Sequence, residues 1–480
     1  MTGLSFSIGI APFFNTYIFL LFLMTTEKPI HLTRAFGLLD ATALNISNMV
    51  GVGPFITIPL LMASMGGPQS MLGWLTGAVI VISDGLIWSE LGAALPGSGG
   101  SYHFLREAYG HQSWGRLMAF LFIWQFVLSG PLEIASGMIG FGSYSSYLWP
   151  GLTARGQQYV AVAAGLVALL LLCRKITFLS KVTLTLWIGT MLAMLAVIVT
   201  GFPHFDAHKA FDFPPGAMSF SRGFVLGLGS ATLIAVYNYL GYYDVCYIGD
   251  EVENPGYVVP RSILYSLLIC CIAYFTLHLA VMGVVPWREG IHSNFIISDF
   301  MERLYGRGAA IAITLLILWA AFGSVFALLL GYSTVPYAAA LEGYFFKPFA
   351  KLHPTKNYPQ VSLLVLGGVS IAAAFLKLDQ LVAALITTRI LVQFLGQLFA
   401  IPLLRRKFPD SARPYKMWFY PIPVIIAFFG WAYVFLTSGW LYIKIGLLTL
   451  LTGVLVFFIW SKWKATWPFE TQSRVNSHST

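Results

Sequence analysis

Apolar stretches long enough to cross a membrane recur along almost the whole chain, and they limit the possible folds more than any other feature. A hydrocarbon core about 30 Å thick requires about 20 apolar residues per helix. The runs are continuous rather than alternating, which excludes an outer-membrane barrel. We therefore predict an all-α integral membrane protein with twelve transmembrane helices. The expected spans are about 36–63, 71–94, 116–148, 158–172, 182–200, 223–248, 262–285, 308–335, 361–376, 381–404, 420–437 and 440–460.

Composition and charge agree with this class. Hydrophobic residues make up 58% of the 480 residues and charged residues 10%, which excludes an ordinary soluble protein. If the residues before the first span are cytoplasmic, 19 of the 28 Lys and Arg residues lie on that side and 8 on the other. This excess follows the positive-inside rule. We expect the densest basic patch, 405–416, to meet anionic lipid headgroups, and we expect no nucleic-acid partner.

The first 24 residues form a separate feature. Leu4 to Met24 is apolar but lacks the basic start and the small-residue cleavage site of a secretory signal. Two interpretations stay open: a thirteenth span, or a start codon assigned too early, with Met24 as the true beginning. We prefer the second, in which 1–24 is a dispensable leader. The protein would then be one domain over 25–460 with a tail at 462–480, and both termini would be cytoplasmic.

The centre of the first span, Gly51-Val52-Gly53-Pro54, carries helix-breaking residues. The two glycines allow the backbone to leave the helix, and Pro54 suits the first turn of a new half-helix. Such a half-helix would present N–H groups and a positive dipole end to an anion such as a carboxylate. The alternative is that the glycines only allow tight helix packing. Candidate substrate-binding residues here are Asn48, Gly51, Val52 and Gly53.

A second break is expected at Gly241 in the sixth span, within the segment YNYLGYYDVC. Irregular backbone at membrane depth occurs only where it is buried in protein or lines a wet cavity. One break near the start of each five-span half is typical of inverted-repeat transporters with a site at the midplane. We expect the first repeat at about 33–202, the inverted repeat at about 220–405 and the last two spans at about 420–461.

Four charged residues are expected within the spans, namely Asp84, Glu133, Asp244 and Arg389. A charge at the bilayer centre costs roughly 2.5 kcal/mol or more unless it is paired or wetted. Glu133 and Arg389 both lie near the middle of their spans, and three interpretations stay open. The two residues pair with each other, Glu133 and Asp244 bind a cationic substrate, or one of these acids exchanges a proton.

Several motifs along the chain resemble those of one known family, the amino acid–polyamine–organocation permeases, over roughly residues 33–460. Within that family the chain is most similar to plant-type polyamine uptake and related amino acid permeases. The motifs are Gly51-Val52-Gly53 with Phe55, Glu90-Leu91 followed by Pro96-x-Ser98-Gly99-Gly100-x-Tyr102, Asp250 to Pro255 followed by Val259-Pro260-Arg261, the segments 337–343 and 348–359, and the loop 405–415.

This resemblance implies a leucine-transporter-type fold with spans 1 and 6 broken. It implies a substrate whose carboxylate meets backbone N–H groups at Gly51 to Gly53. Its amino group would meet carbonyls near Tyr237 to Gly241. Tyr237 falls at the family's aromatic-gate position, and an aromatic face next to a helix break can cover an ammonium group. The alternative for Tyr237 is an ordinary core aromatic residue.

The resemblance also indicates residues for coupling. Asp84 lies where related permeases carry a glutamate in span 2, and Glu133 matches an acid in span 3. Asp244 falls one residue later than the family's acid, which would rotate it by about 100° on a regular helix. Proton-coupled relatives often carry a lysine in span 5 where this chain has Thr190. We therefore expect either that Arg389 supplies this charge or that Glu133 carries the proton.

The acids after the second break, Asp250, Glu251 and Glu253, are interpreted as an inner gate. Acids are disfavoured at a helix C-terminus, so we expect partners such as Arg34 or Arg106. A solvated loop is the alternative.

The sequence predicts a secondary transporter of amino acids or related amines in the cell membrane. It would work by alternating access and be driven by protons or exchange. No G-x-x-x-x-G-K-[ST] motif occurs, so ATP is not expected as the driver. No His/Asp/Glu cluster at ligand spacing occurs on a span, so neither an enzyme, a metal nor a cofactor is expected. The alternatives are a dedicated polyamine transporter, a transporter-like nutrient sensor and an intramembrane enzyme.

Overall fold

The computed structural model describes residues 36–97, 99–173, 179–356, 358–407 and 413–469, without the side chains of 179–187. Helices make up the regular secondary structure of these residues, and the only β-type contacts among them are two isolated bridges. Seven of the described helices are long and apolar enough to cross a membrane, or up to eight if one bent pair counts as a single span. The predicted all-α membrane class is therefore confirmed.

Each predicted apolar span overlaps at least one described helix, but several bounds differ, and the longest helix, α13, has a kink at Gly306, where φ is 78°. Their bounds are α2 Leu38–Met49, α3 Gly53–Met65, α4 Leu72–Ala94, α5 Ser101–Tyr109, α6 Trp114–Leu148, α7 Ala154–Leu172, α8 Leu179–Gly201, α9 Ala207–Ala210, α10 Arg222–Tyr239, α11 Pro255–Met282, α12 Trp287–Gly290, α13 Ile296–Leu341, α14 Gln360–Ala373, α15 Leu378–Arg389, α16 Leu395–Lys407, α17 Ile422–Thr437 and α18 Trp440–Lys464.

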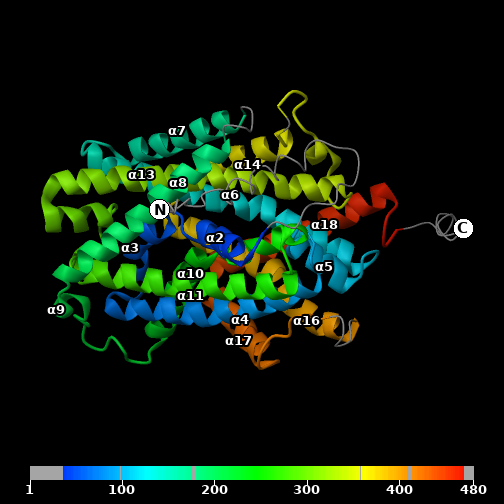
Figure 1. The fold of residues 1–480 in the computed structure, drawn as a ribbon, viewed down its shortest axis with the longest axis horizontal. Coiled ribbons are helices and arrows are strands. Elements are labelled where there is room, and N and C mark those ends of the chain that lie inside the picture. The colour runs from blue at the N-terminus through cyan, green and yellow to red at the C-terminus, as the bar shows by residue number, and fades with distance from the viewer. Residues whose placement is uncertain (1–35, 98, 174–178, 357, 408–412, 470–480) are drawn as a thin grey trace, which may run out of the picture.

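Figure 1 shows α4 and α11 on one side of the bundle and α6, α13 and α7 on the other, with α2 and α10 between the two groups. Small residues allow α4 and α10 to pack closely. A Cβ added to Gly73 would lie 2.6 Å from the Ala231 Cβ, and one added to Gly77 would lie 2.9 Å from the Ala235 Cβ. Close approach at small residues is how helices associate where no hydrophobic effect drives them together.

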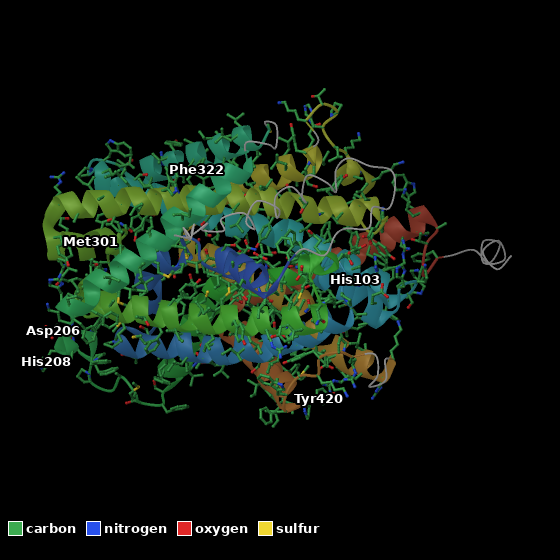
Figure 2. The ribbon with its side chains drawn as sticks, in the orientation of Figure 1. His103, Asp206, His208, Met301, Phe322 and Tyr420 are labelled. Carbon is green, nitrogen blue, oxygen red and sulfur yellow. The ribbon has the colours of Figure 1, made fainter. Side chains whose placement is uncertain are left out.

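Figure 2 identifies the two ends of the bundle, with Asp206 and His208 at one end and His103 toward the other.

Both predicted helix breaks are present. α2 and α3 form a bent pair with an angle of 52° between them. α10 ends at Tyr239, and Gly241 has a φ of 104°, a left-handed conformation that favours glycine. The segment after Gly241 is not the α-helix expected as far as residue 248. It forms two short 3₁₀ turns, η5 (Asp244–Tyr247) and η6 (Gly249–Glu251). The Asn45 side chain of α2 holds the first turn by accepting a hydrogen bond from the Val245 N–H at 2.9 Å.

A third irregularity lies in span 10. A π-helical turn, η8 (Ile390–Phe394), separates α15 from α16 directly after Arg389. The sequence prediction treated this span as regular, and no glycine or proline marks the site. Single π turns inside helices are frequently found at functional sites.

A buried ion cluster ties the end of α4 to the segment after α16. Glu90 is fully buried and accepts hydrogen bonds from Arg405 Nε at 2.9 Å, Arg405 Nη2 at 2.7 Å and Arg413 Nη1 at 2.9 Å. The Met417 N–H donates to the same carboxylate at 2.9 Å. Two arginines of the basic patch 405–416 therefore bind Glu90, and lipid contact stays a prediction only for the rest of that patch.

Replacing Glu90 with glutamine should destabilise the protein by about 3–5 kcal/mol, because two mostly buried arginines lose their counter-charge. The measurement is the midpoint of heat-induced unfolding in detergent. The matched control is Glu289→Gln, which removes one acid from an exposed pair with Arg303 and should cost no more than about 1 kcal/mol. Equal midpoints for the two variants would contradict the assignment of the cluster as a structural link.

Candidate functional site

The two helix breaks contact each other directly. A Cβ added to Gly241 would lie 3.0 Å from the Cβ and the carbonyl carbon of Asn48 and 3.1 Å from the Met49 nitrogen. No larger residue fits this position without moving one of the two segments. The end of α10 is therefore held against the end of α2, at the point where α2 gives way to α3.

A cavity of about 70 Å³ lies beside this contact. The lining brings together six of the predicted substrate-binding residues, namely Asn48, Gly51, Val52, Gly53, Glu133 and Tyr237. Of the other two, Gly241 packs behind Asn48, and the Asp244 carboxyl lies beside the Asn48 side chain. Residues that the sequence analysis did not assign to the site also line the cavity: Ser47, Met49, Ser136, Gly137, Asn238, Leu240, Ser324, Ala327 and Leu328.

The start of α3 faces the cavity, and its amides have a partner that the sequence did not reveal. The Val52 N–H donates a hydrogen bond to the Ser324 hydroxyl of α13 at 3.1 Å. A Cβ added to Gly51 would lie 2.7 Å from the same hydroxyl oxygen. In this conformation a neutral side chain therefore occupies the amide where a carboxylate is expected.

The opposite wall is formed by α10. A Cβ on Gly53 would lie 2.6 Å from Asn238 Oδ1 and 3.4 Å from the Tyr237 ring. Asn238 Nδ2 donates to Thr57 Oγ1 at 2.9 Å and to the Ile234 carbonyl at 2.8 Å, so this residue joins α10 to α3. Its Oδ1 is buried and has no hydrogen-bond partner. A buried acceptor without a donor is costly, so this oxygen is suited to receive a donor from a ligand.

Tyr237 is held in place by α6. Its hydroxyl lies 2.7 Å from the Ser136 Oγ, which also donates to the Glu133 carbonyl at 2.5 Å. The ring is only 7% exposed. Its orientation toward the start of α3 is therefore fixed by a hydrogen bond as well as by packing.

Glu133 and Arg389 form the ion pair that was one of the interpretations of the sequence. Arg389 Nη2 lies 2.7 Å from Glu133 Oε2, and Arg389 is 1% exposed. Tyr332 donates its hydroxyl to the same carboxylate at 2.7 Å, and Arg389 Nε donates to Ser129 Oγ at 3.2 Å. The carboxylate at the cavity wall is therefore largely neutralised by a buried guanidinium.

The family model described as amino acid permease matches residues 36–461 of this chain. The chain belongs to the amino acid permease family. It is similar to three curated transporters at low identity, and it covers most of each. They are the branched-chain amino acid permease BcaP of Bacillus subtilis (25% identical over 457 residues, 90% of this chain and 94% of the relative), the human cystine/glutamate transporter (26% over 457 residues, 92% and 88%) and the serine/threonine exchanger SteT of Bacillus subtilis (26% over 449 residues, 91% and 98%).

Membership establishes the permease as a membrane-embedded, multi-pass transporter of the secondary type, and its relatives are transporters, not enzymes. Its substrates are small molecules. The relatives' names refer to amino acids, so the dedicated polyamine transporter, which the sequence left open, is not favoured.

The predicted coupling residues of the permease are distributed over three places. Arg389 does not belong to the cavity lining, but it binds Glu133, which does. Asp84 lies outside the cavity lining, fully buried, where its carboxyl meets Tyr242 and Trp431. Thr190 is buried on α8 and does not belong to the cavity lining either.

Glu251 lies after the second break and is 2% exposed. Its carbonyl accepts a hydrogen bond from the Phe36 N–H at 3.1 Å, which ties the chain before α2 to the segment after α10. Burial, together with the charge of Asp250, raises the pKa of Glu251 to about 8. The side chain is therefore mainly protonated at neutral pH and becomes charged as the pH rises through 8.

The predicted pairing of Arg106 with the acids at 250–253 is wrong. Arg106 binds Glu107 at 3.0 Å and Glu342 at the end of α13 at 2.5 Å, because α5 packs along α6 and turns this side chain toward α13. The other suggested partner, Arg34, lies outside the described residues.

Replacing Gly53 with alanine should reduce substrate transport by about tenfold or more, because the added methyl group would overlap Asn238 Oδ1 and separate α3 from α10. The measurement is the initial rate of uptake into proteoliposomes, normalised to reconstituted protein. The control is Gly331→Ala on α13, where an added Cβ meets no atom within 4 Å. If Gly53→Ala transported at the same rate as the control, a tight α3–α10 contact would not be required for transport.

Proposed function

We propose that the permease carries neutral α-amino acids across the cell membrane by alternating access. The observation that carries this proposal is the meeting of two broken helices at one cavity. The N-terminal end of α3 faces this cavity from one side, and the C-terminal end of α10 faces it from the other. Helix ends of opposite polarity match a zwitterion, which carries a carboxylate and an ammonium group on one carbon.

The carboxylate would bind at the amides of Val52 and Gly53. The positive end of α3 favours an anion there. The Ser324 hydroxyl already accepts a hydrogen bond from the Val52 N–H, so a carboxylate oxygen can replace it with the same geometry. A charged acceptor makes the stronger hydrogen bond of the two.

The ammonium group would bind at the end of α10. The carbonyl end of this helix is the negative pole of its dipole. Asn238 Oδ1 is a buried acceptor without a donor, and the Tyr237 ring provides an aromatic face for a cation. Asp244, beside Asn48, adds a further acid close to this position.

The ion pair at the cavity wall favours a substrate with a neutral side chain. Because Arg389 compensates Glu133, this acid would offer little excess negative charge to the further positive charges of a polyamine. The part of the cavity that would hold the substrate side chain is lined by small or apolar residues, namely Gly137, Leu240, Ala327 and Leu328. Names of relatives that refer to branched-chain amino acids and to serine and threonine support this choice.

Access to the cavity differs at its two sides, which supports alternating access. A second cavity of about 330 Å³ lies toward α12 and the start of α15. Gly140 and Ile56 line it, and a Cβ added to Gly140 would lie 3.0 Å from Ile56 and 3.6 Å from Val52, which lines the first cavity. Packed side chains of α3 and α6 therefore lie between the two cavities. At the opposite end the Glu90 cluster and the Phe36–Glu251 contact close the bundle.

The finer organisation is part of the same proposal. We infer twelve spans, with α2/α3 and α15/α16 each counted as one, arranged as two inverted five-helix repeats at about 33–202 and 220–405 within one domain over 25–460. The end that carries α5 and α16 would face the cytoplasm together with both termini.

Glu251, Arg389 and Thr190 would act in gating, and coupling would run through protons or exchange. The basic residues of 405–416 that do not bind Glu90 would meet anionic lipids.

The test is counterflow in proteoliposomes that contain unlabelled leucine, with radiolabelled leucine outside. Unlabelled leucine and alanine should compete. Two matched analogues should not, since isopentylamine lacks the carboxylate and 4-methylpentanoate lacks the ammonium group. Putrescine should not compete either. Competition by putrescine or isopentylamine equal to that of leucine would contradict the zwitterion site. Binding of leucine without flux would indicate a sensor instead of a carrier.

A further inference from the structure

Asp84 on α4 is a buried acid that the substrate cavity does not use. Its side chain is completely buried. The Tyr242 hydroxyl forms a short hydrogen bond with one carboxyl oxygen, and the Trp431 Nε1–H donates to the other at 3.4 Å. Both partners are neutral groups.

No basic side chain in the described part of the chain lies within ion-pair distance of Asp84. Glu90, further along the same helix, provides the contrast, since two arginines and a backbone N–H compensate its charge. A carboxylate without a counter-ion in a dry interior is strongly unfavourable, whereas the neutral acid is tolerated. The environment of Asp84 therefore suits a protonated carboxyl group, and that of Glu90 suits a charged one.

On α11, Leu267 and Ile263 lie against Gly85, the residue next to Asp84. The titratable groups on the surrounding described elements have other partners than Asp84. Asp244, on the segment that follows Tyr242, lies beside Asn48, Tyr243 beside Gln393, and Arg261 of α11 donates to the Tyr257 carbonyl. The others with a known contact are Tyr239 with the Trp74 carbonyl, His278 with Trp74, Tyr274 with the Met49 carbonyl, Cys246 with the Trp88 carbonyl, Tyr433 with the Val225 carbonyl, Arg405 with Glu90, and Cys270 and Cys271 near Tyr239 and Tyr274.

Asp84 nevertheless contacts one irregular segment near the substrate cavity directly and the other through Trp431 of α17. Tyr242 directly follows Gly241, which packs against Asn48 of the cavity lining. Trp431 stacks on Phe394 at 3.9 Å between ring centroids, and Phe394 ends the π turn that begins directly after Arg389. A movement of either segment on substrate binding would change the surroundings of this one carboxyl group.

We propose that Asp84 is a proton-binding site of the transport cycle. In the conformation described here Tyr242 and Trp431 exclude water, and the carboxyl group holds one proton. When the segment after Gly241 moves, water reaches the carboxyl group, its O–H bond breaks, and the proton passes to that water and leaves a carboxylate. This inference rests on the proposed transport of amino acids, and it assigns the proton to a site separate from the Glu133–Arg389 pair.

The test compares two modes of leucine transport in proteoliposomes, counterflow and uptake driven by an imposed pH gradient, with a pH-sensitive dye in the lumen. The key variant is Asp84→Asn, in which a neutral amide of nearly the same shape can keep both hydrogen bonds. It should retain counterflow within about a factor of three, and it should lose accumulation above equilibrium and the proton entry that the dye reports. A factor of three corresponds to about 0.7 kcal/mol.

The variant Tyr242→Phe provides a second test that does not depend on the folding of Asp84→Asn. The aromatic ring stays, but the hydroxyl that contacts the carboxyl group is removed. Because hydrogen bonding changes the proton affinity of a carboxyl group, the pH of half-maximal driven uptake should shift by about 0.5 unit or more. Trp431→Phe should shift the same profile.

The outcomes separate this inference from the proposed function. No counterflow by the wild-type permease would mean that the proposed function fails. Counterflow without proton-driven uptake in the wild type would overturn only the proton site. Proton-driven accumulation by Asp84→Asn would also overturn the proton site, and so would an unchanged pH profile in Tyr242→Phe. Loss of driven uptake with retained counterflow, together with the shifted profile, would support it.

Discussion

The contact of Gly241 with Asn48 and Met49 is the constraint on which the rest of the site depends. Gly241 has a φ of 104° and no room for a Cβ, so the ends of α2 and α10 can meet only because this residue is a glycine. Their meeting places the amide end of α3 opposite the carbonyl end of α10. The zwitterion site that we propose then follows from backbone polarity, and side chains such as Asn238 and Tyr237 would complete it.

Three buried acids, Glu90, Glu133 and Asp84, differ in how their charge is compensated, and each environment suits a different role. Glu90 has two arginines and a backbone amide, which suits a permanent link at one end of the bundle. Glu133 has one arginine and borders the cavity, where, in the proposed site, it would set the charge that a substrate side chain meets. Asp84 has only neutral partners, one of which directly follows the second break. Asp84 therefore lacks a compensating cation among the described residues, and a movement of that break would change its surroundings.

Much of the fold follows from the sequence, because apolar length and the Gly-Pro content of a span act locally. Burial cost also made the pairing of Glu133 with Arg389 one of the three interpretations of the sequence, and the structure contains this pair. The partner of the Val52 amide could not be found in this way, since Ser324 is 272 positions away and reaches it only through packing. The π turn after Arg389 carries no breaker residue. The concern over the facing of Asp244 assumed a regular helix, but the backbone has already left the helix at Tyr239. Arg106 was assigned the wrong partner because the direction of α5 depends on its packing.

A structure of the permease determined with a bound amino acid tests the central claim most directly, namely that the two helix breaks form one zwitterion site. The expected result places the carboxylate on the amides of Val52 and Gly53, with the Ser324 hydroxyl displaced, and the ammonium group within hydrogen-bond distance of Asn238 Oδ1. A carboxylate bound to Arg389, with the Val52 N–H still donating to Ser324, would contradict it.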